Sequence, residues 1–194
     1  MKKVLTIIAS AFLLSACGAT STTTNLQFPD SSLKITPTSY LLSITPSTQN
    51  DPLVGLNTKD GQIVIKLYQK ETPNTVANFL KKVNSGFYNG LTFHRVIPGF
   101  MAQGGDPMGT GNGGGTIKSE LNNLPFKKGS LGLARTPDTK EVSNDSQFFI
   151  CYDDTGCSHL TGDYVNFGEV ISGFESLNSI NQGDKIISII TTTK

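Results

Sequence analysis

Short apolar runs separated by turn residues dominate the chain from Gly61 onwards, and they constrain the fold more than any other feature. Within Gly61–Tyr68 the apolar residues Ile63, Ile65 and Leu67 alternate with the side chains of a second face, which is the period of a β-strand. Many short strands with few helices predict a mainly antiparallel sheet that closes into a barrel or packs as a sandwich. The further strand-like runs are Leu91–Ile97, Phe100–Gln103, Ser130–Ala134, Gln147–Cys151, Val165–Val170 and Lys185–Thr191.

Two segments carry helix signals. Thr72 followed by Pro73 is typical of an N-cap and first helical position, and Gly86 suits the end of that helix. A second, shorter helix is predicted at Phe174–Ile180. Within the first helix, apolar residues recur at helical spacing: Val76, Phe79, Leu80 and Val83.

The first 17 residues have the layout of a secretory signal peptide. Lys2 and Lys3 precede an apolar run from Val4 to Leu14, and small residues precede Cys17. The ending L-S-A-C resembles the lipobox of bacterial lipoproteins, in which the cysteine is acylated and becomes the new N-terminus. We therefore expect an exported lipoprotein, anchored in a membrane by palmitate and related acyl chains on Cys17 and facing the periplasm or the cell exterior. The alternative is an ordinary cleaved signal peptide with a chance cysteine.

Residues 18–52 differ in composition from the rest of the chain. Of these 35 residues, 14 are Ser or Thr, four are Pro, and only Asp30, Lys34 and Asp51 are charged. Such a segment buries too little apolar surface to offset its ordering entropy, so we predict a tether leading to a folded domain at 53–194. The alternative is an added strand or strap on that domain, formed by an apolar cluster: Leu33, Ile35, Tyr40, Leu41, Leu42 and Ile44.

Charge and residue types argue against several classes of function. Removal of the signal peptide with its two lysines leaves 14 Lys and Arg against 15 Asp and Glu, which argues against nucleic-acid binding through a basic patch. The only histidines are His94 and His159, and the carboxylates are scattered, so we expect no metal and no cofactor. The glycine-rich run Gly104–Gly115 lacks the G-K-[ST] ending of a phosphate-binding loop, and we predict a loop beside a pocket.

The stretch Phe93–Asp106, F-H-R-V-I-P-G-F-M-A-Q-G-G-D, is the strongest candidate for a functional site. In extended segments Arg95 and Gln103 can face one groove, and Phe100 and Met101 would then supply its apolar floor. The alternative is an arginine that pairs with an aspartate on the sheet wall above core residues. Spacing alone favours this structural interpretation.

Five blocks occur in a fixed order along the chain: Thr72–Phe79 (T-P-N-T-V-A-N-F), Gly86–Gly90 (G-F-Y-N-G), Phe93–Asp106, Ser146–Ile150 (S-Q-F-F-I) and Val165–Val170 (V-N-F-G-E-V). Together they resemble the cyclophilin family of peptidyl-prolyl isomerases, over residues 54–194. The resemblance implies a closed eight-stranded antiparallel β-barrel capped by two α-helices. It also implies a peptidyl-prolyl cis-trans isomerase that acts on proline-containing polypeptides, here exported ones.

The resemblance further implies roles for individual residues. Arg95 falls on the family's catalytic arginine, and Gln103 falls on the glutamine that supports it. Three positions depart from common family residues: Arg135 is often Asn, Tyr164 is often His and His159 is often Trp. That Trp is associated with cyclosporin binding, so we expect weak inhibition by cyclosporin. The positions implied to bind substrate are Phe100, Met101, Ala134, Arg135, Phe149, His159, Leu160 and Tyr164.

The chemistry of these residue types suits prolyl isomerisation. No bond to carbon is made or broken, so neither a nucleophile nor a metal is needed. Loss of amide resonance returns a lone pair to the prolyl nitrogen, and a fixed guanidinium can donate a hydrogen bond to it. His94, beside Arg95, is expected to be structural rather than a proton carrier. The alternative function is a cyclophilin-fold chaperone module that binds proline-containing segments with little turnover; a monomer is expected in both cases.

Two cysteines, Cys151 and Cys157, remain once Cys17 is acylated. An exported location permits a disulfide between them. However, Cys151 continues the apolar run Phe148–Ile150 and can equally be a buried free thiol. The sequence leaves both alternatives open.

Overall fold

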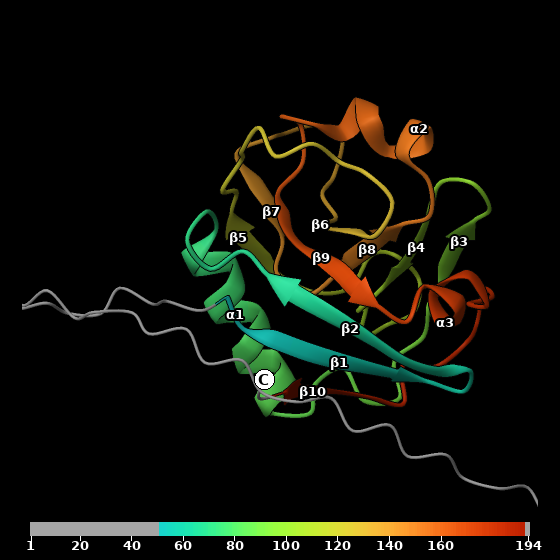
Figure 1. Cartoon of the computed structure of the whole chain (residues 1–194). Helices are drawn as coiled ribbons and strands as arrows, with labels where there is room; N and C mark the ends of the chain where they lie inside the picture. The colour runs from blue at the N-terminus through green and yellow to red at the C-terminus, as the bar shows by residue number, and fades with distance from the viewer. Residues whose placement is uncertain (1–50, 193–194) are drawn as a thin grey trace, which may run out of the picture. The chain divides into compact units, whose positions relative to one another are not determined.

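An eight-stranded antiparallel sheet is the framework of residues 51–192, the part of the chain that the computed structural model describes. Figure 1 shows this sheet strongly curled. The mainly β, antiparallel prediction is therefore confirmed. In spatial order the strands are β10 (Ser188–Thr192), β1 (Leu53–Thr58), β2 (Gly61–Leu67), β9 (Asn166–Ser172), β6 (Ser130–Leu133), β8 (Phe148–Cys151), β4 (Met101–Gly104) and β3 (Arg95–Ile97).

The two ends of the sheet, β10 and β3, approach each other without pairing along their length. The residues just before each strand are hydrogen-bonded instead: Ile186 N–H donates to the Leu91 carbonyl and Phe93 N–H donates to the Asp184 carbonyl, both at 2.8 Å. No ladder joins β3 to β10 among the strands of residues 51–192. The prediction of eight antiparallel strands in one curled sheet is thus confirmed. Pairing of the two edge strands, which would close the sheet into a barrel, is not observed within residues 51–192.

Three strands lie where the sequence predicts none. Strand β1 precedes the first predicted strand and pairs with both β2 and β10. A separate two-stranded sheet joins β5 (Thr116–Lys118) to β7 (Val142–Asn144). Each of these last two strands has only three residues, which is too short for an alternating pattern to stand out.

Two of the three α-helices within residues 51–192 were predicted. Helix α1 (Pro73–Asn84) has its C-cap at Ser85, and Gly86 follows with φ +69°, as the helix-stop prediction requires. Thr72 occupies the N-cap position, but Glu120 satisfies the helix start, because its carboxylate accepts the N–H groups of Asn74 at 3.1 Å and Thr75 at 2.8 Å.

The second predicted helix is shorter than expected, at Phe174–Asn178 (α3). One-turn helix α2 (Asp154–Cys157) and the 3-10 turn η1 (Ser158–Leu160) were not predicted. Asp153 caps α2 by accepting the N–H of Thr155 at 2.8 Å. No helix within residues 51–192 is long and apolar enough to cross a membrane.

Two apolar clusters fill the interior. The larger cluster packs α1 against the sheet, with Phe79 in contact with Tyr88, Phe148 and Phe167 at ring-centroid distances of 5.2, 5.8 and 5.3 Å. The smaller cluster lies on the opposite face of the β4–β8 pair and underlies the site described below. Its buried members are Met101, Phe126, Phe149, Cys151, Cys157 and Leu160.

The predicted signal peptide (1–17), its lipidation site Cys17 and nearly all of the tether (18–52) lie outside the described residues and remain predictions. The expected domain (53–194) begins where β1 begins, at Leu53.

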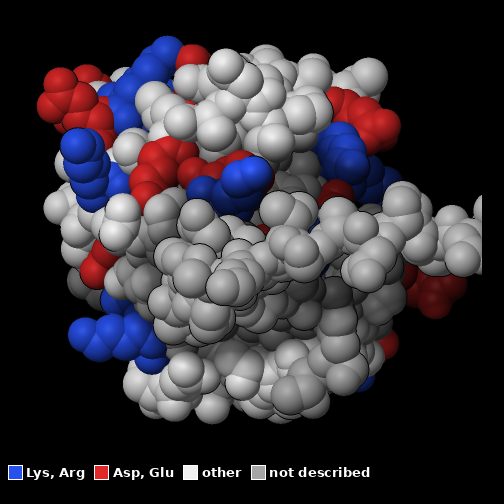
Figure 2. Space-filling model, turned by 60° about the vertical axis from the view of Figure 1, so that its left-hand side comes forward, with Lys and Arg blue, Asp and Glu red and all other residues white. Residues whose placement is uncertain are grey.

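Figure 2 shows Lys and Arg side chains interspersed with Asp and Glu on the described part of one face. That face therefore carries no broad region of a single charge.

Candidate functional site

A cavity of about 280 Å³ lies where β3, β4 and β8 meet the η1 turn and the end of β6. All ten residues for which the sequence predicts catalysis or substrate binding line it, although they come from five separate segments of the chain. Their individual roles stay predictions, but their gathering around one cavity is observed. The lining residues are Arg95, Phe100, Met101, Gln103, Ala134, Arg135, Phe149, His159, Leu160 and Tyr164.

A chain of hydrogen bonds holds Arg95 at the cavity. Arg95 lies opposite Gln103 in the β3–β4 ladder, and its Nη1 donates to Gln103 Oε1 at 3.2 Å. Gln103 Nε2 donates in turn to Oε1 of the buried Gln147 at 3.0 Å. Gln147 Nε2 donates to the carbonyls of Gly111 at 3.0 Å and Gly113 at 2.8 Å. The exposed Arg95 guanidinium is thus connected through Gln103 to the buried side chain of Gln147.

Asp106 shapes the glycine-rich loop whose carbonyls accept the last hydrogen bonds of this series. Its carboxylate accepts the N–H groups of Met108 and Thr110, each at 2.8 Å, and of Gly111 at 2.5 Å. Burial by itself raises the pKa of the Asp106 carboxyl, but the backbone donors of residues 108–113 outweigh it and hold the pKa below its ordinary value. The prediction of a loop beside a pocket is confirmed, since this loop supplies the two carbonyls that hold Gln147.

The cavity floor is apolar and buried. Met101, Phe149 and Leu160 are each at most 5% exposed. Phe126 stacks against Phe149 from below, with ring centroids 5.6 Å apart. Gly132 lies against the same ring so closely that a Cβ there would overlap it. The floor is therefore a packed hydrophobic surface, which offers a small ring a place away from water.

Aromatic side chains form the walls above this floor. The His159 ring lies beside Phe100, with centroids 5.7 Å apart and planes at 32°. Tyr164 contacts Phe149 edge-on at 5.9 Å. The Arg135 guanidinium lies over the Tyr164 ring, 4.4 Å from its centroid. The exposed His159 therefore lies at the cavity beside Phe100, and its equivalence with the family's Trp stays a prediction from the resemblance.

A disulfide joins Cys151 to Cys157 beneath the cavity, with Cα atoms 6.2 Å apart. This outcome decides between the two alternatives that the sequence left open. The bond connects the end of β8, which carries Phe149, to the end of α2, and the η1 turn with His159 and Leu160 begins at the next residue. Both cysteines are fully buried.

His94 does not line the cavity. Both of its ring nitrogens are buried and have no hydrogen-bond partner within residues 51–192. Burial lowers the pKa of the imidazole; nearby Asp106 raises it and Arg95 lowers it further, and the net effect is a lowered pKa. A neutral, unpartnered ring agrees with the expected structural role.

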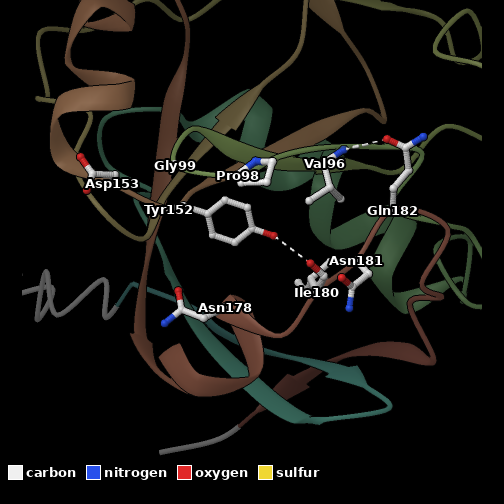
Figure 3. A pocket seen from close by; sticks show the side chains of 9 residues that line it. All are labelled: Val96, Pro98, Gly99, Tyr152, Asp153, Asn178, Ile180, Asn181 and Gln182. Atoms are coloured by element: carbon white, nitrogen blue, oxygen red, sulfur yellow. Dashed lines mark hydrogen bonds between the residues drawn. The ribbon is translucent and has the colours of Figure 1, made fainter.

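A second and larger cavity, of about 550 Å³, lies on the other side of the turn between β3 and β4. Figure 3 shows Tyr152 at its centre, with the phenol donating to the Ile180 carbonyl at 3.3 Å. Burial raises the pKa of Tyr152 to about 12. The lining includes Asp153 but no Lys, Arg or His, so this cavity lacks the cation that distinguishes the smaller one. The smaller cavity is the candidate active site.

Sequence reasoning missed Gln147 as part of the site. Gln147 lies inside the S-Q-F-F-I block, next to the strand that carries Phe149, and it is 2% exposed. A polar residue at the start of an apolar strand is the only signal for it in the sequence. That signal does not indicate which partners the side chain would meet.

Comparison with known proteins agrees with this geometry. Residues 53–192 match the family model described as cyclophilin type peptidyl-prolyl cis-trans isomerase/CLD. The chain belongs to the cyclophilin family. Its relatives include a peptidyl-prolyl cis-trans isomerase of Synechococcus elongatus, 42% identical over 71% of this chain and 94% of that protein. Another is peptidyl-prolyl cis-trans isomerase B of Bacillus subtilis, 46% identical over 65% of this chain and 88% of that protein.

Solved structures give the same family. A cyclophilin type peptidyl-prolyl cis-trans isomerase of Cryptosporidium parvum superposes with a TM-score of 0.69 at 32% identity, covering 74% of this chain and 99% of that protein. The same protein, crystallised in the presence of the dipeptide Ala-Pro, gives a TM-score of 0.67. This cyclophilin is thus an isomerase of the peptidyl-prolyl class.

Proposed function

We propose that this cyclophilin accelerates rotation about X-Pro bonds by donating a hydrogen bond from Arg95 to the prolyl nitrogen, while the apolar cavity holds the proline ring. The uncatalysed barrier is about 18–20 kcal/mol because resonance gives the C–N bond partial double-bond character. In the twisted state this resonance is lost and the nitrogen becomes an acceptor. A donor that bonds only to the twisted state lowers the barrier, and each 1.4 kcal/mol gives about tenfold in rate.

The fixed position of Arg95 supports this mechanism. Its guanidinium presents a rigid set of donors and is oriented by Gln103, which Gln147 holds from behind. The floor at Met101 and Phe149 excludes water from one side of the ring. The dry surface strengthens the Arg95 contact and leaves the residue before the proline free to rotate.

The observation that carries the proposal is the convergence of Arg95 with buried apolar side chains at one cavity. The test is cis-trans exchange of an X-Pro peptide, measured by NMR with wild type, Arg95→Ala and Lys81→Ala. Lys81 is exposed on α1 and controls for the loss of one positive charge. We expect Arg95→Ala to lose most of the acceleration with an unchanged circular dichroism spectrum. Full activity in that variant contradicts the mechanism, and no acceleration by wild type favours the chaperone alternative.

The site of action that we propose is outside the cytoplasm, on proline-containing segments of exported proteins. The support is the signal-like start with its L-S-A-C ending, together with a disulfide at Cys151–Cys157, because disulfides persist in oxidising compartments. Acylation of Cys17 would then anchor the protein in a membrane. Replacement Cys17→Ser should move it from the membrane fraction to the soluble fraction, and unchanged partitioning contradicts the anchor.

A further inference from the structure

Arg135 is a cation of the groove that the proposed mechanism does not use. It lines the candidate active-site cavity together with Arg95, and it also lines a neighbouring cavity of about 110 Å³. Gln103 and Ala134 are likewise common to both cavities. Arg135 therefore lies where the groove continues beyond the proline pocket, towards residues that flank the proline of a bound chain.

The Arg135 side chain is held in place but its charge is not neutralised by its own partners. Nε donates to the Asp163 carbonyl at 3.0 Å, and Nη1 donates to the carbonyls of Thr136 at 2.9 Å and Thr139 at 3.0 Å. The guanidinium plane rests on the Tyr164 ring. Nη2 has no hydrogen-bond partner within residues 51–192. A fixed cation with a spare donor can bind an anion without further ordering of its side chain.

No carboxylate lines either cavity. The two nearest carboxylates, Asp138 and Asp163, lie outside the lining, although Arg135 is close enough to help lower the pKa of each. Asp163 also forms an ion pair with Lys140 at 2.5 Å. Among the lining residues the groove thus presents two guanidinium groups and no negative charge. A bound peptide that carries an acidic side chain would meet complementary charge, whereas a basic one would meet repulsion.

We propose that Arg135 makes this cyclophilin selective for X-Pro segments with an Asp or Glu side chain close to the proline. This inference rests on the proposed isomerase site. Arg95 acts on the prolyl nitrogen, and Arg135 acts on the flanking sequence. The site then distinguishes clients by charge, in addition to binding the ring that all X-Pro substrates share.

The test compares peptides with a single variable residue. Each peptide contains one X-Pro bond, has an acetylated N-terminus and an amidated C-terminus, and carries Glu, Gln or Lys at one position within three residues of the proline. Blocked termini leave the variable side chain as the only charge. The catalysed exchange rate is measured by NMR with the full chain, and peptide affinity is measured by calorimetry on the same samples. If the protein does not accelerate exchange, the affinities alone still compare the Glu, Gln and Lys peptides.

We expect kcat/KM and affinity in the order Glu, Gln, Lys for at least one position, with about three- to tenfold between Glu and Gln, typical of a partly exposed charged contact. The order should weaken when salt is raised from about 0.02 M to about 0.5 M, because salt screens exposed charges. The preference should disappear in Arg135→Gln and survive in part in Arg135→Lys. Exposed Lys70→Gln, which lines neither cavity and removes the same charge, should keep it.

Equal values for Glu and Gln at every position in wild type overturn the inference. So does an unchanged preference in Arg135→Gln, which would assign the selectivity to Arg95 instead. If Arg135→Gln fails to fold, Arg135→Lys and the salt series still decide. Failure of the isomerase proposal has a different signature: wild type then accelerates none of the peptides, whatever their charge.

Discussion

Arg95 and Gln103 face each other across the two strands of one hairpin, and Nη1 of Arg95 donates to Oε1 of Gln103 at 3.2 Å. The turn between β3 and β4 sets this register, so both side chains reach the same side of the sheet. Gln103 also donates to the buried Gln147. The glutamine thus connects an exposed cation to the interior, and it should restrict the directions in which the guanidinium can point.

Replacement of Gln103 by Leu should lower kcat/KM about tenfold, which corresponds to about 1.4 kcal/mol of transition-state stabilisation. The physical reason is that Arg95 loses its orienting acceptor and the buried Gln147 loses its donor. The measurement is NMR exchange on an X-Pro peptide. Gln62→Leu, an exposed site at the β1–β2 hairpin, is the matched control and should behave as wild type. A Gln103→Leu enzyme with the wild-type rate would show that Arg95 needs no such partner.

Gly132 should be indispensable for the shape of the pocket floor. A Cβ at this position would overlap the Phe149 ring, so Gly132→Ala should displace that ring, destabilise the fold by about 1–3 kcal/mol and raise KM. Urea denaturation and peptide kinetics measure the two effects. The double variant Gly132→Ala/Phe149→Leu tests the cause, because a smaller side chain should recover part of the lost stability. If the stability losses of the two single substitutions add up in the double variant, overlap with the Phe149 ring is not the cause of the Gly132→Ala effect.

Local sequence patterns predict the long elements well. The alternation in Gly61–Tyr68 corresponds to β2, in which Ile63, Ile65 and Leu67 are fully buried. The Pro73 and Gly86 signals bracket α1. These predictions succeed because each depends on neighbours in sequence, which periodicity and capping rules describe.

The candidate site could not be predicted from local pattern alone. Spacing around Arg95 favoured a structural ion pair, and the structure pairs Arg95 with Gln103 instead. The cavity needs Phe149 and Tyr164 from distant segments, and only the family resemblance linked them to Arg95. The cap of α1 by Glu120 was unpredictable for the same reason, since the partners are far apart in the chain.

The Cys151–Cys157 disulfide should add modest stability, because it closes a short loop with a sequence separation of six. A loop of this size corresponds to about 2 kcal/mol in the chain-entropy description. A dithiol reductant should therefore lower Tm by about 4–8 °C. Cys17→Ser should respond to the reductant as wild type does, whereas Cys151→Ser/Cys157→Ser should not respond. An unchanged Tm after both thiols are shown to be free would contradict a stabilising bond.

His159 should account for weak inhibition by cyclosporin. It lies at the rim beside Phe100, and the family resemblance predicts that it stands where the family often has Trp. His159→Trp adds apolar surface at the rim and should tighten inhibition several-fold, on the order of 1 kcal/mol, with a smaller change in peptide turnover. Inhibition constants for both proteins with one peptide test this. His159→Phe separates general aromatic contact from a specific effect of Trp, and equal inhibition of all three proteins would rule out the rim residue as the determinant.

His94 should make the fold less stable in mild acid. Burial lowers its pKa in the folded state below the ordinary 6.5, and both ring nitrogens lack partners within residues 51–192. The unfolded chain therefore binds the proton first as pH falls. The stability that the neutral ring contributes is complete above pH 6.5, is lost as pH falls below that value, and stops changing below the folded-state pKa. The urea midpoint should fall between about pH 7 and pH 5 in wild type and fall less in His94→Phe. The exposed His159→Gln is the control, and identical pH profiles for wild type and His94→Phe would assign the acid sensitivity to other groups.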